Sequence, residues 1–211
     1  MIEKRMSQIW VGDKPAPLKL TNQWKAMYQA AGWKYHLWTN DDFKLPMFDI
    51  VRDKVRELLD KPYVEFNGQA DLMRWAICIK YGGWVIDADS VPVETFPDEW
   101  NQHKAVAFWE NETCRPGLVA AGYFGCEAGS PLVKDIVERI RTTDVRAKMA
   151  WETVGPMPLT LESQKHPELK VLPARHVLPR HFSGVLAPGN DKIFADQLWL
   201  STHHGGYEKY Q

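Results

Sequence analysis

Hydrophobic residues follow two different spacings along this chain. Apolar positions three and four residues apart predict helices over 24–31, 51–59, 68–81 and 131–140. Short apolar runs predict strands over 7–11, 34–38, 84–86, 104–109 and 118–125, and weaker ones near 169–172 and 176–178. The proline-rich segment 154–158 is expected to be a loop. Strands that alternate with helices predict an α/β fold whose sheet is covered on both faces.

One succession of helix, turn and strand carries the most informative pattern. Asn67 is expected to cap the helix, a pair of glycines ends it, and the next strand leads to Asp87 and Asp89. Residues two apart on an extended backbone point to the same side, so both carboxylates can converge on one ion. Mg²⁺ and Mn²⁺ prefer oxygen ligands and often share them with substrate phosphates. The pattern therefore predicts a divalent-cation site, with a solvated acidic turn as the alternative.

Asp71 and Arg74 lie three positions apart, so they share one face of the predicted helix. The short glycine turn brings this helix back alongside the strand that carries Asp87. A carboxylate and a guanidinium that face a ligand can hold sugar hydroxyls in a fixed orientation. A surface ion pair of little energetic consequence is the alternative.

Two further segments carry candidate ligand-binding residues. Near the end of the chain, His203 or His204 can bind a metal, while Gly206 and Lys209 suit a diphosphate. At the end of the first strand, Trp10 can stack on a nucleobase. The alternatives are a terminal segment without function and a tryptophan that only packs in the core.

Composition and charge limit the kinds of partner that the chain is expected to bind. The chain has 211 residues and a formal net charge of −1, with no basic run, so nonspecific binding of nucleic acid by a charged face is not expected. No apolar run reaches the ~20 residues needed to span a bilayer, and the N-terminal residues lack the apolar stretch of a signal peptide. These features predict a single domain over 1–211 that is a monomer in the cytoplasm, or a domain cut from a larger protein.

Several motifs resemble glycosyltransferase family 32, the family with a sugar-binding region that contains a DXD motif. The stretch GQADLMRWAICIKYGGWVIDADSV at 68–91 resembles its central block, and QIWVG at 8–12, LWTN at 37–40 and TVGP at 153–156 resemble flanking segments. The segment 203–210 resembles the HxxGxxKPW ending of the related glycogenin-like transferases, without its Pro-Trp. Clostridial toxin glucosyltransferases are further relatives of this family. Ala70 replaces the usual Ser, and Trp84 the usual Ile or Met.

The resemblance implies a GT-A fold, which has a mixed, mostly parallel central sheet flanked by helices. Residues 1–95 would form the nucleotide-sugar and metal half, and 96–211 the acceptor half with the C-terminal metal and diphosphate segment. The implied catalytic residues are Asp71, Arg74 and Asp87, and the implied metal ligands are Asp87, Asp89 and His203. The implied donor-binding residues are Gln8, Trp10, Val11, Asp71, Arg74, Asp87, Ala88, Asp89, Gly206 and Lys209.

The implied reaction is transfer of a hexose from a nucleoside diphosphate sugar to a hydroxyl of a carbohydrate acceptor, with Mn²⁺ or Mg²⁺ and with retention of configuration. UDP-glucose and UDP-galactose are the favoured donors, and GDP-mannose stays open. Segments 109–126 and 151–182 are expected to line the acceptor site. A microbial or virus-encoded enzyme fits these features. Two alternatives remain: a nucleotidyltransferase that makes the sugar nucleotide, and a noncatalytic sugar-binding module.

Overall fold

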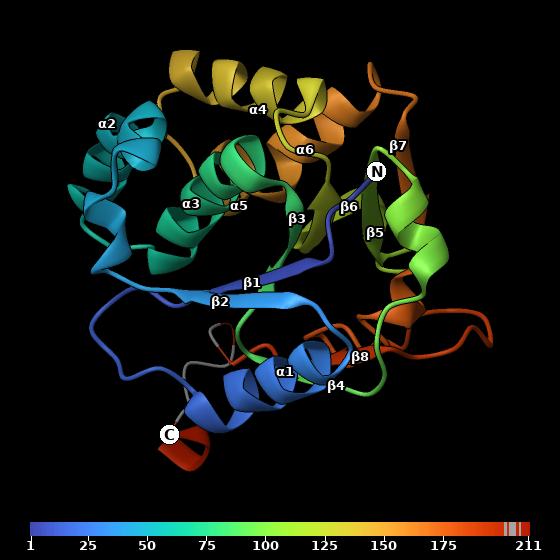
Figure 1. Cartoon of the computed structure of the whole chain (residues 1–211). Coiled ribbons are helices and arrows are strands. Elements are labelled where there is room, and N and C mark those ends of the chain that lie inside the picture. Colours follow the sequence, from blue (N-terminus) through green and yellow to red (C-terminus); the bar gives the residue numbers. More distant parts are fainter. Residues whose placement is uncertain (201, 203–205, 207) are drawn as a thin grey trace.

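The computed structural model describes residues 1–200, 202, 206 and 208–211 (Figure 1). The strands are β1 (Arg5–Ile9), β2 (Lys34–Trp38), β3 (Gly83–Asp87), β4 (Ser90–Pro92), β5 (Ala105–Asn111), β6 (Arg115–Cys126), β7 (Leu169–Leu172) and β8 (Ala195–Gln197). The helices are α1 (Leu18–Ala30), α2 (Asp49–Leu59), α3 (Phe66–Tyr81), α4 (Pro131–Thr142), α5 (Ala150–Thr153) and α6 (Pro156–Ser163). Short 3-10 turns lie between them.

The main sheet has the strand order β2-β1-β3-β6-β5-β7. The pairs β1–β2, β1–β3 and β5–β7 are parallel, whereas β6 is antiparallel to both β3 and β5. The strands other than β6 therefore run in one direction, and the carboxyl ends of β1, β3 and β5 meet at the same edge. Ligands of open α/β sheets bind at this edge. The carboxyl end of β3 is Asp87.

Apolar layers cover both faces of this sheet. One core cluster packs α2, α3, α4 and α6 against one face, and it includes Val55, Trp75, Ile136 and Leu159. The other cluster packs α1 and the segments around β8 against the opposite face, and it includes Trp24, Trp84 and Ala195. Figure 1 shows the same division, with α2, α3, α4 and α6 on one side and α1, β4 and β8 on the other. The predicted α/β class and the covered sheet are confirmed.

Helix α3 is buried on most of its surface, since Leu72 through Cys78 are all buried. The helix is therefore covered by other elements on more than one face. Asn67 is not the cap, because the helix begins at Phe66 and the capping position is Glu65. The Glu65 carboxylate does not cap the helix: it forms an ion pair with Lys61 and accepts a hydrogen bond from the backbone N–H of Ala150 (2.9 Å).

Two loop and strand expectations are wrong. The segment 154–158 is not a loop throughout, because α6 begins at Pro156. Proline fits the first helical turn, where its missing N–H has no partner to lose. The segment 176–178 is not a strand: a 3-10 helix covers Ala174–His176. No described helix has both the length and the apolar character required to cross a bilayer.

Candidate functional site

Arg74 connects the helix to the strand that ends at the sheet edge. Its side chain is buried, and its Nη1 donates to the carbonyl oxygen of Val85 at 2.8 Å. Nη2 donates to Asp87 Oδ1 at 2.6 Å, and Nε lies 3.4 Å from Asp71 Oδ1. Arg74 can reach both Val85 and Asp87 because, after Gly82 and Gly83, strand β3 runs back alongside α3. The predicted Asp71–Arg74 pair is thus joined to Asp87 in one chain of contacts, and it is not a surface pair.

Asp89 lies beyond the end of β3 and is held by the C-terminal part of the chain. Gln197 Nε2 donates to Asp89 Oδ1 at 2.7 Å, and the backbone N–H of Leu200 donates to Oδ2 at 2.8 Å. The pairing of β4 with β8 brings these partners into position. The backbone bends at Ala88 and Asp89, so the extended geometry expected for the two aspartates is wrong. They still lie close enough for the charge of Asp87 to affect Asp89.

Burial changes the acidity of two of these carboxyls. The pKa of Asp89 is raised to about 6, first because the group is removed from water and second because Asp87 is negative. The pKa of Asp71 is raised to about 7, again mainly by burial, although the positive charge of Arg74 opposes the shift. Both groups would be easier to ionise if additional positive charge were bound beside them.

Two glycines make room for the carboxylates. A Cβ on Gly122 of β6 would overlap Asp87 Oδ2, and a Cβ on Gly155 before α6 would overlap Asp71 Oδ2. Neither glycine has a positive φ, so close approach and not backbone conformation accounts for the residue type. Gly155 belongs to the TVGP segment noted in the sequence.

The first strand supports this edge of the sheet. The side chain of Gln8 is buried, donates from Nε2 to the carbonyl oxygen of Asp87 (3.1 Å) and accepts from the Tyr35 hydroxyl (2.8 Å). Gln8 therefore holds β2, β1 and β3 together. Val11 is buried, whereas Trp10 is half-buried, with its indole N–H donating to the carbonyl of Lys14 at 2.7 Å. Ala88 is buried between the two aspartates.

The C-terminal segment reaches the same region. His203 and His204 lie outside the described residues. Gly206 lies beside Leu200 and Lys209, since a Cβ on Gly206 would be 3.6 Å from the Leu200 side chain and 3.8 Å from that of Lys209. The two residues predicted to bind a diphosphate, Gly206 and Lys209, therefore lie near Leu200, whose N–H donates to Asp89. The carbonyl of Lys209 accepts from Lys19 Nζ of α1 at 3.0 Å. Leu200 and Leu20 form a small apolar cluster against which Trp10 and Tyr210 pack.

Sequence reasoning missed three contributors to the site: Gln197, the backbone of Leu200, and Gly122. The separation of 108 positions between Asp89 and Gln197 leaves no local signal. Gly122 lies in a strand-like run, and an isolated glycine in such a run indicates a close approach of another group. That signal was available, although it does not identify the partner.

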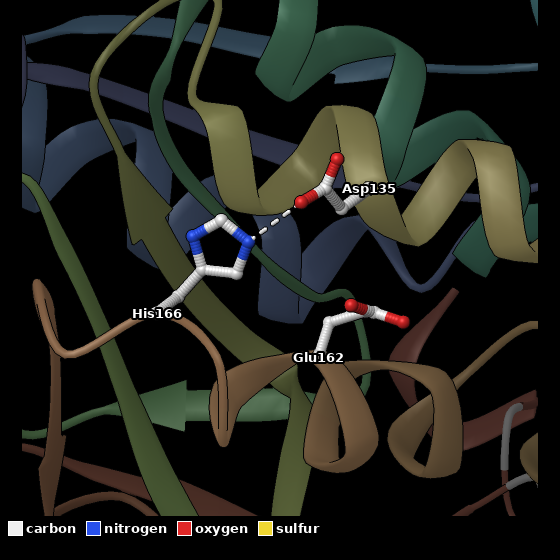
Figure 2. Close-up of side chains that lie close together, drawn as sticks. All are labelled: Asp135, Glu162 and His166. Atoms are coloured by element: carbon white, nitrogen blue, oxygen red, sulfur yellow. Dashed lines mark hydrogen bonds and ion pairs between the residues drawn. The ribbon is translucent and has the colours of Figure 1, made fainter.

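A second cluster of metal-ligand types lies between α4 and α6, on the other face of the sheet from β4 and β8. Ligand atoms of Asp135, Glu162 and His166 lie within 4.8 Å of one another (Figure 2). His166 contacts Asp135 (2.9 Å) through Nε2 and Glu168 (2.8 Å) through Nδ1, which favours an imidazolium with both nitrogens protonated. Glu162 pairs with Arg139 and with Lys165.

The charges of this second cluster are already balanced within the protein. Hydrogen bonds from Lys165 and Arg139 hold the pKa of Glu162 below its usual value, although burial alone would raise it. Because Glu162 is paired with two cations and both ring nitrogens of His166 contact carboxylates, we assign the cluster to stability and not to metal binding.

The fold is similar to that of solved glycosyltransferases. The glycosyltransferase PaToxG matches with a TM-score of 0.58 and 15% identity, over 79% of this chain and 70% of that chain. The galactosyltransferase LgtC, solved in complex with donor and acceptor sugar analogues, matches with a TM-score of 0.51 and 9% identity, over 98% and 93%. No protein-family model matches the sequence, and no curated protein matches it. The chain thus has the GT-A fold of glycosyltransferases.

Proposed function

We propose that this chain is a metal-dependent glycosyltransferase that transfers a hexose from a nucleoside diphosphate sugar to a carbohydrate hydroxyl. The observation that carries the proposal is the set of three carboxylates, Asp71, Asp87 and Asp89, at the carboxyl edge of a GT-A sheet. One cation, Arg74, contacts this set within the described residues. The shared fold with glycosyltransferases gives the class of reaction to test.

The residues fit a divalent cation in their chemistry. Asp89 Oδ1 accepts from Gln197 and Oδ2 from the backbone N–H of Leu200, and a carboxylate has further lone pairs for a cation. Burial and the negative charge of Asp87 raise the pKa of Asp89, and a bound cation would oppose both effects. Mn²⁺ or Mg²⁺ would be held by Asp89 and Asp87, with His203 as a further ligand. When bound, the ion stabilises charge that develops on the leaving phosphate, a contribution of several kcal/mol.

The protein groups bind and orient the donor. Asp71 can accept a hydrogen bond from a sugar hydroxyl when it is ionised. Arg74 fixes Asp71 and Asp87 relative to each other. Gln8 keeps the backbone of Asp87 in place, Gly206 and Lys209 bind the diphosphate, and Trp10 stacks on the base.

We further propose retention of configuration, with the acceptor attacking from the side that the phosphate leaves. UDP-glucose and UDP-galactose are the favoured donors. Residues 1–95 act as the donor half and 96–211 as the acceptor half of one domain.

The test is release of nucleoside diphosphate from UDP-glucose, UDP-galactose and GDP-mannose, with Mn²⁺ or with EDTA. We expect hydrolysis of one donor, abolished by EDTA and reduced about 10³-fold by Asp89→Asn, since several kcal/mol of charge stabilisation are lost. Asp135→Asn, a carboxylate of the balanced cluster, should retain wild-type turnover. Formation of UTP or GTP and a sugar 1-phosphate when pyrophosphate is added to the sugar nucleotide would indicate the nucleotidyltransferase, and sugar binding indifferent to metal would indicate the binding module.

A further inference from the structure

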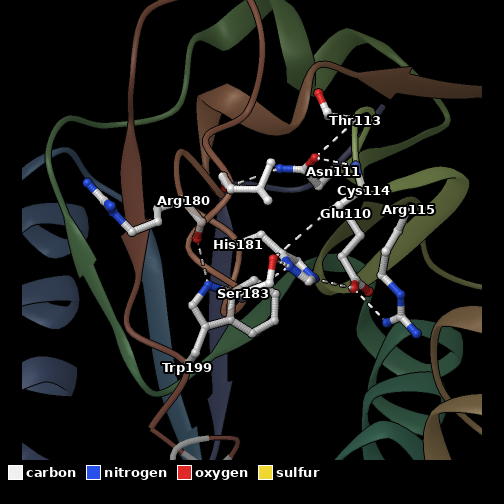
Figure 3. A network of polar contacts seen from close by, with 10 residues as sticks. Glu110, Asn111, Thr113, Cys114, Arg115, Arg180, His181, Ser183 and Trp199 are labelled. Atoms are coloured by element: carbon white, nitrogen blue, oxygen red, sulfur yellow. Dashed lines mark hydrogen bonds and ion pairs between the residues drawn. The ribbon is translucent and has the colours of Figure 1, made fainter.

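A network of polar and aromatic groups lies at the end of β5, outside the donor residues described above. Glu110 is buried at this end and Arg115 Nη1 donates to its Oε1 at 2.8 Å (Figure 3). His181 Nε2 lies 3.2 Å from the same oxygen. Because β5 runs in the same direction as β3, Glu110 and Asp87 lie toward the same edge of the sheet.

His181 is fixed in one orientation and one tautomer. Its Nδ1 accepts from the backbone N–H of Ser183 (3.3 Å), which can only donate, and lies 2.7 Å from the Ser183 hydroxyl. The proton of a neutral imidazole must then be on Nε2, from which it is donated to Glu110. Both contacts of Glu110 go to Oε1, and within the described part of the chain Oε2 makes no hydrogen bond.

The network extends to both ends of the donor site. The guanidinium of Arg115 lies over the ring of Trp151, 4.5 Å from its centroid. Trp151 in turn lies beside Gly155, the residue that contacts Asp71: a Cβ on Gly155 would be 3.4 Å from the Cα of Trp151 and would overlap Asp71 Oδ2. At the other end, the ring of His181 lies 5.4 Å from that of Trp199, whose next residue donates its N–H to Asp89. The network therefore spans the region between Asp71 and Asp89.

Aromatic side chains accompany these polar groups. Phe182 is 37% exposed and its ring lies 5.5 Å from that of Trp199. Trp199 has a φ of 55°, a conformation that is costly for a bulky residue and that often occurs at functional sites. Its indole N–H donates to the carbonyl of Arg180 at 2.8 Å, which holds the ring in place.

We propose that Glu110 and Arg115 bind adjacent hydroxyls of a pyranose acceptor, while Phe182 and Trp199 contact the C–H face of its ring. A carboxylate and a guanidinium form strong, directional bonds to hydroxyls, and aromatic walls with a few convergent polar groups are typical of small-ligand sites. His181 is a positioning residue, since it orients Glu110. The proposal rests on the proposed function, because the acceptor must lie beside the donor sugar.

The experiment measures binding of methyl glucoside, methyl galactoside and methyl mannoside to the protein saturated with UDP and Mg²⁺, by saturation-transfer NMR; Mg²⁺ is used because Mn²⁺ is paramagnetic. We expect at least one glycoside to bind wild type. Glu110→Gln should weaken it about tenfold or more, because a charge-assisted bond is lost. Phe182→Ala, an exposed position whose truncation leaves the core intact, should weaken it about threefold or more. Glu162→Gln, an equally buried and paired glutamate between α4 and α6, should bind as wild type does.

Three results would overturn the proposal. The first is a glycoside that Glu110→Gln and Phe182→Ala bind as tightly as wild type. The second is UDP binding with Mg²⁺ but no binding of any of the three glycosides, which leaves the donor site intact. The third is binding of a serine peptide in place of the glycosides, which would indicate a protein acceptor. Failure of UDP to bind with Mn²⁺ would instead contradict the proposed function itself.

Discussion

The set of Asp71, Asp87 and Asp89 contains three carboxylates, and so does the α4–α6 cluster when Glu168, which pairs with His166, is included, but their charges are balanced differently. In the first set, Arg74 is the one cation that contacts Asp71 and Asp87 among the described residues. Between α4 and α6, the carboxylates of Asp135, Glu162 and Glu168 meet Arg139, Lys165 and the His166 imidazole. The second cluster is complete, whereas the first has an excess of negative charge.

The acidities follow this difference. Burial raises the pKa of Asp71 and Asp89, whereas the pKa of Glu168 is lowered by its hydrogen bond with His166. A buried carboxylate without enough cations is costly to the folded state, and a protein keeps such groups where a ligand compensates for them. The distances between ligand atoms single out the α4–α6 cluster, whereas the charge balance favours the set of Asp71, Asp87 and Asp89 as the place for a cation.

Removal of the central cation should separate the two regions most strongly. Arg74→Met removes the ion-pair partner of the buried Asp71 and of the half-buried Asp87, so the free energy of unfolding should fall by about 3–5 kcal/mol. Arg139→Met is the matched change in the other cluster. It should cost about 1 kcal/mol or less, because Arg139 is partly exposed and Lys165 still pairs with Glu162. Urea denaturation of both variants measures the difference, and equal losses would contradict it.

Crowding the carboxylates should reduce activity. Gly122→Ala places a Cβ against Asp87, and the displaced carboxylate should lower donor turnover about 10- to 100-fold, since a misplacement of about 1 Å can have this effect. Gly125→Ala on the same strand crowds the Trp84 ring instead. That control should lose stability and keep its turnover per folded molecule. Wild-type turnover in Gly122→Ala would show that the position of Asp87 is unimportant.

The pH dependence of stability should report Asp71. Its folded pKa of about 7 lies above its unfolded value, so the charged form is disfavoured in the folded state and stability is lost as the pH rises. Without metal, the free energy of unfolding should fall by about 2 kcal/mol between pH 5.5 and pH 8 from this group. In Asp71→Asn the fall of about 2 kcal/mol in the free energy of unfolding should be absent. Urea denaturation at a series of pH values measures it. An unchanged slope would place the titration on another group.

The smallest effect is expected at His166. Its carboxylate partners raise its pKa, so its contribution to stability is present at low pH and is lost as the pH rises through the folded value. His166→Gln should cost about 1 kcal/mol at pH 6 and less at pH 9, with donor turnover unchanged. Thermal denaturation at the two pH values checks the first part. A loss of turnover would connect this cluster to the active site.

Local patterns predicted the part of the site that is local in sequence. A helix over 68–81, the glycine turn and a strand over 84–86 follow from spacing alone, and so does the shared face of Asp71 and Arg74. The structure has α3 over Phe66–Tyr81 and β3 over Gly83–Asp87. The partners of Asp89 could not be predicted, because Gln197 reaches it through the pairing of two three-residue strands far apart in the chain. Such short strands carry no periodic signal.

Helices α5 and α6 were missed for a different reason. They are short, and Gly155 and two prolines near their junction are typical of a loop. Gly155 lacks the Cβ that would overlap Asp71 Oδ2. The residue that indicated a loop in the sequence is therefore the one that leaves space for the Asp71 carboxylate.

The most direct test of the account is calorimetric titration of UDP into the protein, with Mn²⁺ or with EDTA. We predict binding with Mn²⁺ that is lost in EDTA and in Asp89→Asn, and that is retained in Asp135→Asn of the α4–α6 cluster. Binding of UDP that persists in EDTA, or that Asp89→Asn leaves intact, would contradict the claim that the excess charge at Asp87 and Asp89 is there to hold a metal–nucleotide complex.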